Sequence, residues 1–148
     1  LLDKHRLPTT VLRLEITEGT LLVDLDIAIS RLKLLKAKGF RLLLDDFGTG
    51  YSSLTYLSQF PIDVLKIDKS FILNLNENPL NKPIIKSIIE LANNLKLSCI
   101  AEGVENEEQL AYLTSLGCRN IQGFYFAKPM PAIDVVSQAF MAQLVFPK

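Results

Sequence analysis

The chain has 148 residues, of which 49% are hydrophobic, so it suits one globular domain with a sizeable core and is not a disordered chain. Its 16 lysines and arginines balance 16 acidic residues, and zero net charge argues against DNA or RNA as a partner, because nucleic-acid phosphates attract excess basic charge. No apolar run is long enough to span a bilayer, so we expect no membrane contact by this segment.

The first half of the chain predicts three strands that alternate with two helices. Residues 24–38 place Ala28, Leu32 and Leu35 on one helical face, and the apolar run at 41–44 is typical of a strand buried on both faces. In chain order, we expect a strand at 11–16, a helix at 24–38 that Gly39 ends, a strand at 41–44, a short helix at 54–59 that Pro61 ends, and a strand at 64–67.

The second half continues the alternation after a polar loop at 74–83. We expect a helix at 84–95, a strand at 97–101, a helix that Asn106 caps and Gly117 ends, a strand at 120–122, and a final helix at 131–144. Strands that alternate with helices in this way predict an α/β fold with a parallel sheet and helical crossovers.

Polar side chains stand at the carboxyl end of every predicted strand. They are Glu15, Asp45, Asp46, Lys66, Asp68, Glu102, Glu105 and Gln122. In a (β/α) barrel these ends converge on one mouth, where active sites are built. Carboxylates that meet there repel one another unless a cation neutralises them, and oxygen-only ligands suit Mg²⁺ or Mn²⁺ better than zinc.

Such a mouth favours chemistry at phosphorus. Two metal ions held by adjacent carboxylates can activate a water and stabilise an in-line displacement. Lys66 lies in an apolar strand, where a lysine requires a partner, and it is a candidate for holding the water or the phosphoryl oxygens. His5 is the only histidine, so histidine-based chemistry is poorly supported. The two cysteines, Cys99 and Cys118, are too few for a disulfide scaffold and indicate a reducing, cytoplasmic location.

Plainer structural roles compete for the same residues. Glu15 could pair with Arg13 or Arg41 instead of binding a ligand. For Glu105, stabilising the amino-terminal dipole of the next helix is as good an interpretation as a role in chemistry. Turn, capping or other structural roles are the corresponding alternatives for Asp45, Asp46, Asp63, Asp68 and Gln122, and core filling is the alternative for the two cysteines.

Five motifs occur in one order along the chain. They are Glu-Ile-Thr-Glu at 15–18, Asp-Asp-Phe-Gly-Thr-Gly-Tyr-Ser-Ser-Leu at 45–54, Leu-Lys-Ile-Asp at 65–68, Ala-Glu-Gly-Val-Glu at 101–105 and Gln-Gly-Phe at 122–124. From about residue 12 to 131 the chain thereby resembles EAL domains, the bacterial cyclic di-GMP phosphodiesterases. The resemblance implies a modified TIM barrel that hydrolyses cyclic di-GMP to linear pGpG with Mg²⁺ or Mn²⁺.

The resemblance also implies roles for single residues. Lys66 resembles the residue that contacts the catalytic water, and Glu105 and Gln122 resemble supporting active-site groups. Glu18 resembles the residue that anchors the loop at 47–53, which in the family couples metal binding to dimerisation. The residues that resemble metal ligands are Glu15, Asp45 as the bridge, Asp46, and Glu102, which is also a proposed general base.

Two departures from the family pattern shape the prediction. A barrel of ordinary size has about 250 residues, whereas this chain lacks the Glu-Ala-Leu signature and a downstream Asn, both of which supply ligands in the family. We therefore expect residues 1–148 to be the C-terminal part of a single EAL domain, with five βα units of a partial TIM-type barrel and the N-terminal strands missing. Gly19 stands where the family usually has Ser, which is expected to loosen the loop anchoring slightly.

The predicted function is therefore that of a cyclic di-GMP-specific phosphodiesterase, with this segment inactive alone. Unpaired strand edges invite pairing with another chain, so we expect a homo-oligomer, most simply a dimer. One alternative is a non-catalytic EAL-like signalling module that binds cyclic di-GMP or a protein partner. Another is an unrelated Mg²⁺-dependent barrel enzyme such as a lyase.

Overall fold

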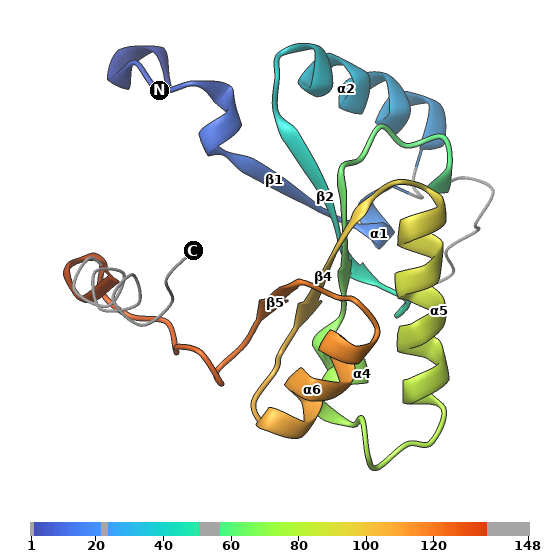
Figure 1. The fold of residues 1–148 in the computed structure, drawn as a ribbon. Coiled ribbons are helices and arrows are strands. Elements are labelled where there is room, and N and C mark those ends of the chain that lie inside the picture. The colour runs from blue at the N-terminus through green and yellow to red at the C-terminus, as the bar shows by residue number, and fades with distance from the viewer. Residues whose placement is uncertain (1, 22–23, 51–56, 136–148) are drawn as a thin grey trace.

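The computed structural model describes residues 2–21, 24–50 and 57–135, and within them five strands form one parallel sheet (Figure 1). The strands pair in the order in which they occur in the sequence, and every neighbouring pair is parallel. They are β1 (Arg13–Thr17), β2 (Arg41–Phe47), β3 (Val64–Ile67), β4 (Ser98–Glu102) and β5 (Asn120–Gln122). The predicted α/β fold and all five predicted strands are confirmed.

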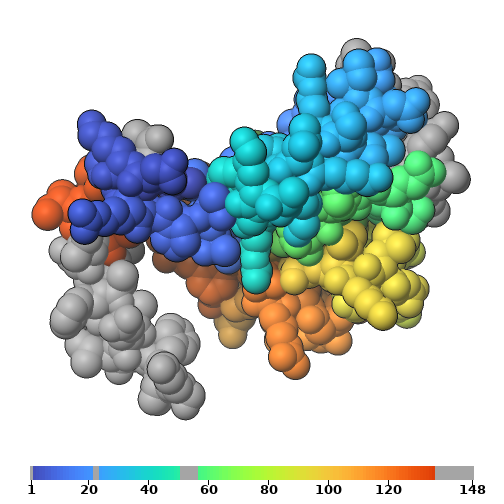
Figure 2. All heavy atoms as spheres, turned by 90° about the horizontal axis from the view of Figure 1, so that it is seen from above, coloured from blue at the N-terminus to red at the C-terminus, as the bar shows by residue number. Residues whose placement is uncertain are grey.

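Helices connect the strands and lie on one side of the sheet. They are α1 (Glu18–Leu21), α2 (Leu25–Ala37), α4 (Lys69–Leu73), α5 (Asn81–Asn94) and α6 (Glu107–Ser115), and two 3-10 turns, η1 (Asp3–His5) and η2 (Thr9–Val11), precede β1. Figure 2 shows from above that the first residues, in blue, project away from the body that carries α2 and α5. The short helix predicted at 54–59 and the final helix predicted at 131–144 lie largely outside the described residues.

Several boundaries differ from the prediction for local reasons. Val11, the first residue of the predicted strand at 11–16, ends η2, and β1 begins at Arg13. α1 and α4 were not predicted because four or five residues carry too little periodicity. Helix α5 begins at Asn81, inside the predicted loop. The buried Asn81 amide donates to the carbonyl oxygens of Phe71 and Asn74, each at 3.1 Å, and so fixes this entry to α5.

The core lies between the sheet and the helices that cover it. Leu42, Leu43 and Leu44 are at most 2% exposed, and all four residues of β3 are buried. Consecutive buried residues have side chains on both faces of a strand, so side chains at the centre of the sheet are buried on both faces, although the helices lie on one of them. This confirms the reading of 41–44 as a strand buried on both faces.

A buried glutamine positions the turn that follows β4. Gln109 is 5% exposed, and its side-chain oxygen accepts the amides of Glu105 and Asn106 at 2.8 and 3.3 Å. The Asn106 side chain accepts the Gln109 amide in return, which completes a capping box at the start of α6. The Gln109 amide group also donates to the Ile72 carbonyl at 3.1 Å, so the Glu105 backbone is held against α4.

Asp63 has a structural role, as the sequence suggested, and its loss should be measurable. Its carboxylate accepts from the Lys36 ammonium at 2.5 Å and from the Leu42 amide at 2.9 Å. Burial raises the pKa of Asp63, but these contacts outweigh that effect, so the pKa lies below its ordinary value. We expect Asp63→Asn to lower the free energy of unfolding by about 1–2 kcal/mol at neutral pH.

The pH dependence of that loss follows from the direction of the shift. A lowered folded-state pKa stabilises the fold above the unfolded pKa of about 3.9, and the stabilisation disappears as the pH falls through the folded-state value. Urea unfolding at pH 7 and at pH 3 measures the difference between wild type and Asp63→Asn. An equal difference at both pH values would contradict the assignment.

Candidate active site at the carboxyl ends of the strands

Lys66 lies at the centre of a cluster of carboxylates from three other strands. Its ammonium nitrogen is 2.9 Å from Glu15 Oε1, 2.9 Å from Asp45 Oδ1 and 2.7 Å from Glu102 Oε1. The Lys66 side chain is 5% exposed, whereas that of Glu15 is 51% exposed. The structure thus brings four of the predicted site residues to one place, and Glu15 pairs with Lys66 rather than with Arg13 or Arg41.

The two adjacent aspartates reach this place through an irregularity in β2. Leu44 pairs with Leu65 and Phe47 pairs with Ile67, so two residues of β2, Asp45 and Asp46, stand opposite one residue of β3, Lys66. This is a β-bulge, which re-aims side chains next to functional sites. Asp46 takes a left-handed backbone conformation with φ of 56°, and its amide donates to Asp45 Oδ1 at 3.1 Å.

The charges in this cluster are not balanced by Lys66 alone. Burial lowers the pKa of Lys66, but its contacts with Glu102, Asp45 and Glu15 raise the pKa above its ordinary value. Burial raises the pKa of Glu102, and the contact with Lys66 lowers it. The neighbouring Asp45 carboxylate raises it again, so the pKa of Glu102 lies above its ordinary value. The pKa of Asp46 is raised by burial and then by its neighbour Asp45. Excess negative charge therefore remains after Lys66 has paired, and a further cation would relieve it.

Three of the predicted site residues line a pocket beside this cluster, the smaller of two pockets that Gln122 borders. Glu102, Glu105 and Gln122 line a pocket of about 310 Å³. Glu102 and Gln122 are register partners at the ends of β4 and β5, so their side chains leave the sheet at the same level. Phe124, of the Gln-Gly-Phe motif, also lines this pocket, and so does Lys69, which was not singled out in the sequence. The signal available for Lys69 was its position, directly after the strand-end motif that contains Lys66.

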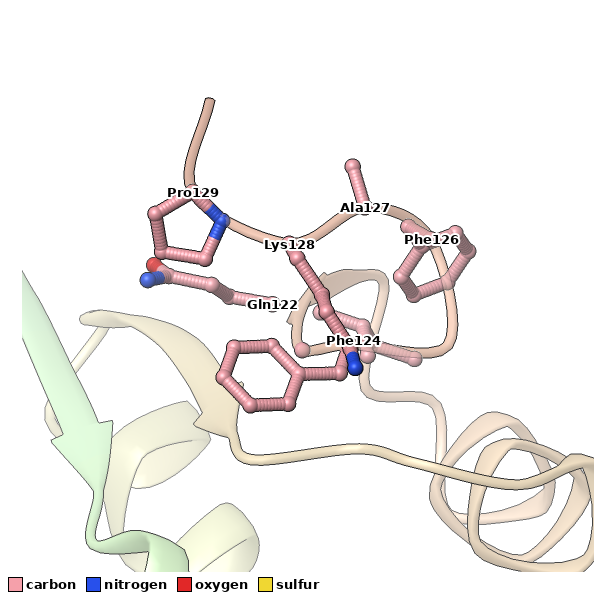
Figure 3. A pocket seen from close by; sticks show the side chains of 8 residues that line it. Gln122, Phe124, Phe126, Ala127, Lys128 and Pro129 are labelled. Atoms are coloured by element: carbon pink, nitrogen blue, oxygen red, sulfur yellow. The ribbon is translucent and has the colours of Figure 1, made fainter. Parts of the chain in front are cut away.

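Gln122 also borders a larger pocket formed by the segment after β5 (Figure 3). This pocket has a volume of about 520 Å³, and Phe124, Phe126, Lys128 and Pro129 contribute to its lining. The Lys128 ammonium lies 5.7 Å from the centre of the Phe124 ring, a cation–π distance. Phe124 and Phe126 are 54% and 56% exposed, so aromatic faces are available on the same side as the carboxylates.

Glu18 lies apart from this cluster. Its side chain is buried, and neither carboxylate oxygen has a hydrogen-bond partner among the described residues. A Cβ atom added to Gly50 would stand 2.6 Å from Glu18 Oε1, so the carboxylate is packed against the backbone of the loop after β2. This contact is compatible with the predicted anchoring role, which stays a prediction because residues 51–53 of the loop lie outside the described residues.

The carboxylates are arranged around an ammonium group, not around an open position. Within 2–21, 24–50 and 57–135, no three acidic, histidine or cysteine side chains are grouped so that they could hold one metal ion as they stand. The donor set nevertheless fits a hard divalent cation, because it consists of carboxylate oxygens in negative excess. The assignment of Glu15, Asp45, Asp46 and Glu102 as metal ligands stays a prediction.

Gly123 is required by the close approach of two chain segments. A Cβ atom at this position would overlap the backbone nitrogen and oxygen of Val104. The Val104 amide donates to the Gln122 carbonyl at 3.1 Å, and the Tyr125 amide donates to the Val104 carbonyl at 2.9 Å, so neither segment can move away without breaking a hydrogen bond. The glycine in the Gln-Gly-Phe motif therefore holds Gln122 against the Glu102–Glu105 turn.

We expect Gly123→Ala to lower the free energy of unfolding by about 1–3 kcal/mol, the usual cost of overpacking. Gly19→Ala is the matched control, because a Cβ atom there meets nothing within 4 Å. The control should change the free energy by no more than about 0.5 kcal/mol. Chemical unfolding of the two variants beside wild type measures both effects, and similar values for the two would contradict the packing argument.

The fold and the site define the chain as part of an α/β domain with an acidic, lysine-centred site at the carboxyl edge of a parallel sheet. The model of the EAL domain family matches residues 1–129. The chain belongs to the EAL domain family. None of the helices in the described parts of the chain is long and apolar enough to cross a membrane.

Curated relatives are much longer than this chain. It is 45% identical over 134 residues to the bifunctional diguanylate cyclase/cyclic di-GMP phosphodiesterase MucR of Pseudomonas aeruginosa, a match that covers 90% of the chain and 20% of MucR. It is 43% identical over 119 residues to the cyclic di-GMP phosphodiesterase PdeR of Escherichia coli, covering 80% of the chain and 18% of PdeR. The chain thus spans about a fifth of the length of these relatives.

Solved structures agree with the described fold. The MucR phosphodiesterase in complex with c-di-GMP has a TM-score of 0.88 and 44% identity, and the match covers 90% of this chain and 54% of that one. Klebsiella pneumoniae BlrP1, solved as a manganese and cyclic di-GMP complex, has a TM-score of 0.80 and 33% identity. The match covers 86% of this chain and 33% of BlrP1. The prediction of an EAL-type α/β fold present in part is confirmed.

Proposed function

We propose that this segment supplies the C-terminal part of the active site of a cyclic di-GMP phosphodiesterase that forms linear pGpG. The observation that carries the proposal is the meeting of Glu15, Asp45 and Glu102 around Lys66 at the carboxyl ends of four strands. Support comes from relatives named as cyclic di-GMP phosphodiesterases and from related structures solved with this nucleotide.

The metal ligands would be Glu15, Asp45, Asp46 and Glu102. Mg²⁺ or Mn²⁺ bound by them would make a water more acidic and neutralise charge on a phosphoryl oxygen. Manganese is the ion in one of the related complexes and calcium is the ion in another. An oxygen-only donor set accommodates all of these ions, so the choice between Mg²⁺ and Mn²⁺ is part of the proposal.

The protein groups have separate tasks in the proposed reaction. Glu102, whose pKa is raised by burial, is suited to accept a proton from the attacking water. Lys66 keeps its positive charge, and its position between the carboxylates suits it to orient that water. Gln122 and Glu105 border Glu102 across the smaller pocket and would position the substrate or the turn that carries Glu102.

The direct test joins this segment to the N-terminal half of the MucR phosphodiesterase domain and measures conversion of cyclic di-GMP to pGpG with Mg²⁺ or Mn²⁺. Turnover that disappears in Lys66→Ala, in a variant shown by circular dichroism to remain folded, supports the proposal. Binding of cyclic di-GMP by calorimetry without turnover would favour the non-catalytic module instead. Absence of both binding and turnover in a folded protein would remove cyclic di-GMP as the ligand.

The segment alone is expected to be inactive and to self-associate. A (β/α) barrel closes with eight strands, whereas β1 and β5 are the edge strands of the five-stranded sheet formed by the described residues. Open edges present unpaired backbone groups that another chain can bind. Analytical ultracentrifugation should give a dimer or larger species, and the same sample should not hydrolyse cyclic di-GMP. A monomer at micromolar concentration, or turnover by the segment alone, would contradict these expectations.

The proposed location is the cytoplasm. Both cysteines are free and buried, as is usual for proteins kept under reducing conditions. Fractionation of cells that express the native protein tests this location, and recovery of the protein in the membrane fraction would contradict it.

A further inference from the structure

Lys69 lies beside the carboxylate cluster but has no task in the proposed reaction. It is exposed and is the first residue of α4, three positions after Lys66. Lys69 lines the smaller pocket together with Glu102 and Glu105, and among the described residues that line this pocket it alone is basic. The pocket is therefore bordered by one cation and two anions.

The ammonium group of Lys69 is available to a ligand. None of the ion pairs in the described parts of the chain includes Lys69. By contrast, Lys66 contacts three carboxylates, and the Lys128 ammonium lies 5.7 Å from the centre of the Phe124 ring (Figure 3). An anion that enters the smaller pocket would thus meet a lysine whose charge is not already paired.

Two contacts fix the backbone of Lys69 against the turn that carries Glu105. Gly103 has a φ of 76°, and a Cβ atom added there would stand 2.7 Å from Lys69 Cβ, so the turn and the start of α4 touch. The Gln109 side chain joins the Ile72 carbonyl of α4 to the Glu105 amide, at 3.1 and 2.8 Å. The two walls of the pocket are therefore held at a fixed separation.

The cyclic dinucleotide of the proposed function carries two phosphates, and one of them is cleaved. The cleaved phosphate would lie where Lys66 and its carboxylates meet, because metal ions held there would act on it. Lys69 pairs with none of these carboxylates and lines the neighbouring pocket, which reaches Gln122 at the end of β5. A phosphate in this pocket would be repelled by Glu102 and Glu105, and Lys69 would offset that repulsion.

We propose that Lys69 binds the phosphate of the cyclic dinucleotide that is not cleaved, a role that rests on the proposed phosphodiesterase function. The Lys69 ammonium donates to a non-bridging oxygen of this phosphate before and during cleavage of the other one. The contact therefore stabilises bound substrate and transition state equally. A cyclic mononucleotide has one phosphate and cannot make this contact while it is cleaved, so Lys69 favours dinucleotides.

The test compares Lys69→Met with wild type in the domain completed with the N-terminal half of MucR. We expect the KM for cyclic di-GMP to rise about tenfold, the scale of one hydrogen bond to a charged group, and kcat to change less than about twofold. Lys69→Arg retains the charge and should restore KM to within about threefold of wild type. The rise in Lys69→Met should shrink between about 50 and about 500 mM NaCl, because salt screens an exposed charge.

Lys86→Met is the matched control. Lys86 lies on α5, its side chain is 60% exposed, and its replacement should leave KM unchanged. Urea unfolding of each variant checks that the domain is folded, and Lys69→Gln repeats the measurement if the methionine variant does not fold.

Different failures have different meanings. Turnover by wild type with an unchanged KM in Lys69→Met would overturn the role of Lys69 and leave the phosphodiesterase function standing. A lower kcat at unchanged KM would place Lys69 at the cleaved phosphate and overturn its assignment to the other one. An equal rise in Lys86→Met, a rise that salt does not reduce, or no recovery in Lys69→Arg would also overturn the proposal. Absence of both binding and turnover in the folded wild-type domain would overturn the proposed function and the role of Lys69 together.

Discussion

Replacement of Lys66 by methionine is expected to lower the free energy of unfolding by about 3–5 kcal/mol, the usual cost of removing one partner from a buried ion pair. Methionine keeps most of the volume of the lysine stem but removes the charge. The carboxylates of Glu15, Asp45 and Glu102, which now lie within 2.9 Å of the ammonium, would then repel one another without compensation. Urea unfolding at pH 7 measures the loss.

Lys36→Met is the matched control for this prediction. Lys36 pairs with Asp63, and the two side chains are 34% and 28% exposed. Partly exposed pairs contribute about 1 kcal/mol or less. If the two lysine variants lost the same stability, Lys66 would not be the electrostatic centre of the site.

The Lys66→Met deficit should shrink in acid. Burial already raises the pKa of Glu102, and loss of the ammonium, which lowers it, would raise this pKa further, so the folded variant would bind more protons than the unfolded chain. Stability of the variant should therefore approach that of wild type as the pH falls from about 7 to about 4. A deficit that stays constant over this range would indicate lost packing rather than repulsion.

Asp45→Asn is expected to reduce hydrolysis of cyclic di-GMP by about a hundred- to a thousandfold in the domain completed with the N-terminal half of MucR, the scale seen when one stabilising group is removed from a catalytic centre. Asparagine has nearly the same shape, and its oxygen can still accept from Lys66 and from the Asp46 amide, which lie 2.9 and 3.1 Å from Asp45 Oδ1. The variant loses a negative charge but retains these contacts.

Glu90→Gln provides the control for this second prediction. Glu90 lies on α5, its side chain is 60% exposed, and its contact in the structure is with Lys86. Rates of pGpG formation and free energies of unfolding should be measured for both variants. Activity within tenfold of wild type in Asp45→Asn would contradict the assignment of Asp45, as would an equal loss in Glu90→Gln.

The sheet was predictable because each strand carries its own signal. β2 contains the apolar run at 42–44, β3 is apolar apart from Lys66, and β5 follows a glycine stop and ends at the start of the Gln-Gly-Phe motif. Apolar runs and turn residues were therefore sufficient. Helices α1 and α4 were missed because such short helices depend on tertiary contacts. Asp68 caps α4 by accepting the Ser70 amide at 2.9 Å, a signal that the sequence contained and that we read only as a structural aspartate.

Which residues form the site was predictable from the sequence, but how they are arranged within it was not. Parallel topology alone brings strand ends together, which is why Glu15, Asp45 and Glu102 meet. The bulge that places Asp45 and Asp46 opposite Lys66 depends on a left-handed residue that is not glycine, and composition does not reveal it. Arg13 and Arg41 lie on the same face of the sheet as Glu15 in the observed register, so strand alternation alone does not exclude them as its partners.

Because Lys66 contacts three other strands, the carboxylate site around it forms only when these strands have folded together. One ammonium on β3 joins β1, β2 and β4, and the outermost of its partners, Glu15 and Glu102, are 87 positions apart in the sequence. No partly folded species that lacks one of these strands can assemble the centre. A nucleotide or cation that binds there would engage only molecules in which β1, β2, β3 and β4 are assembled, so its binding would stabilise these four strands together against unfolding.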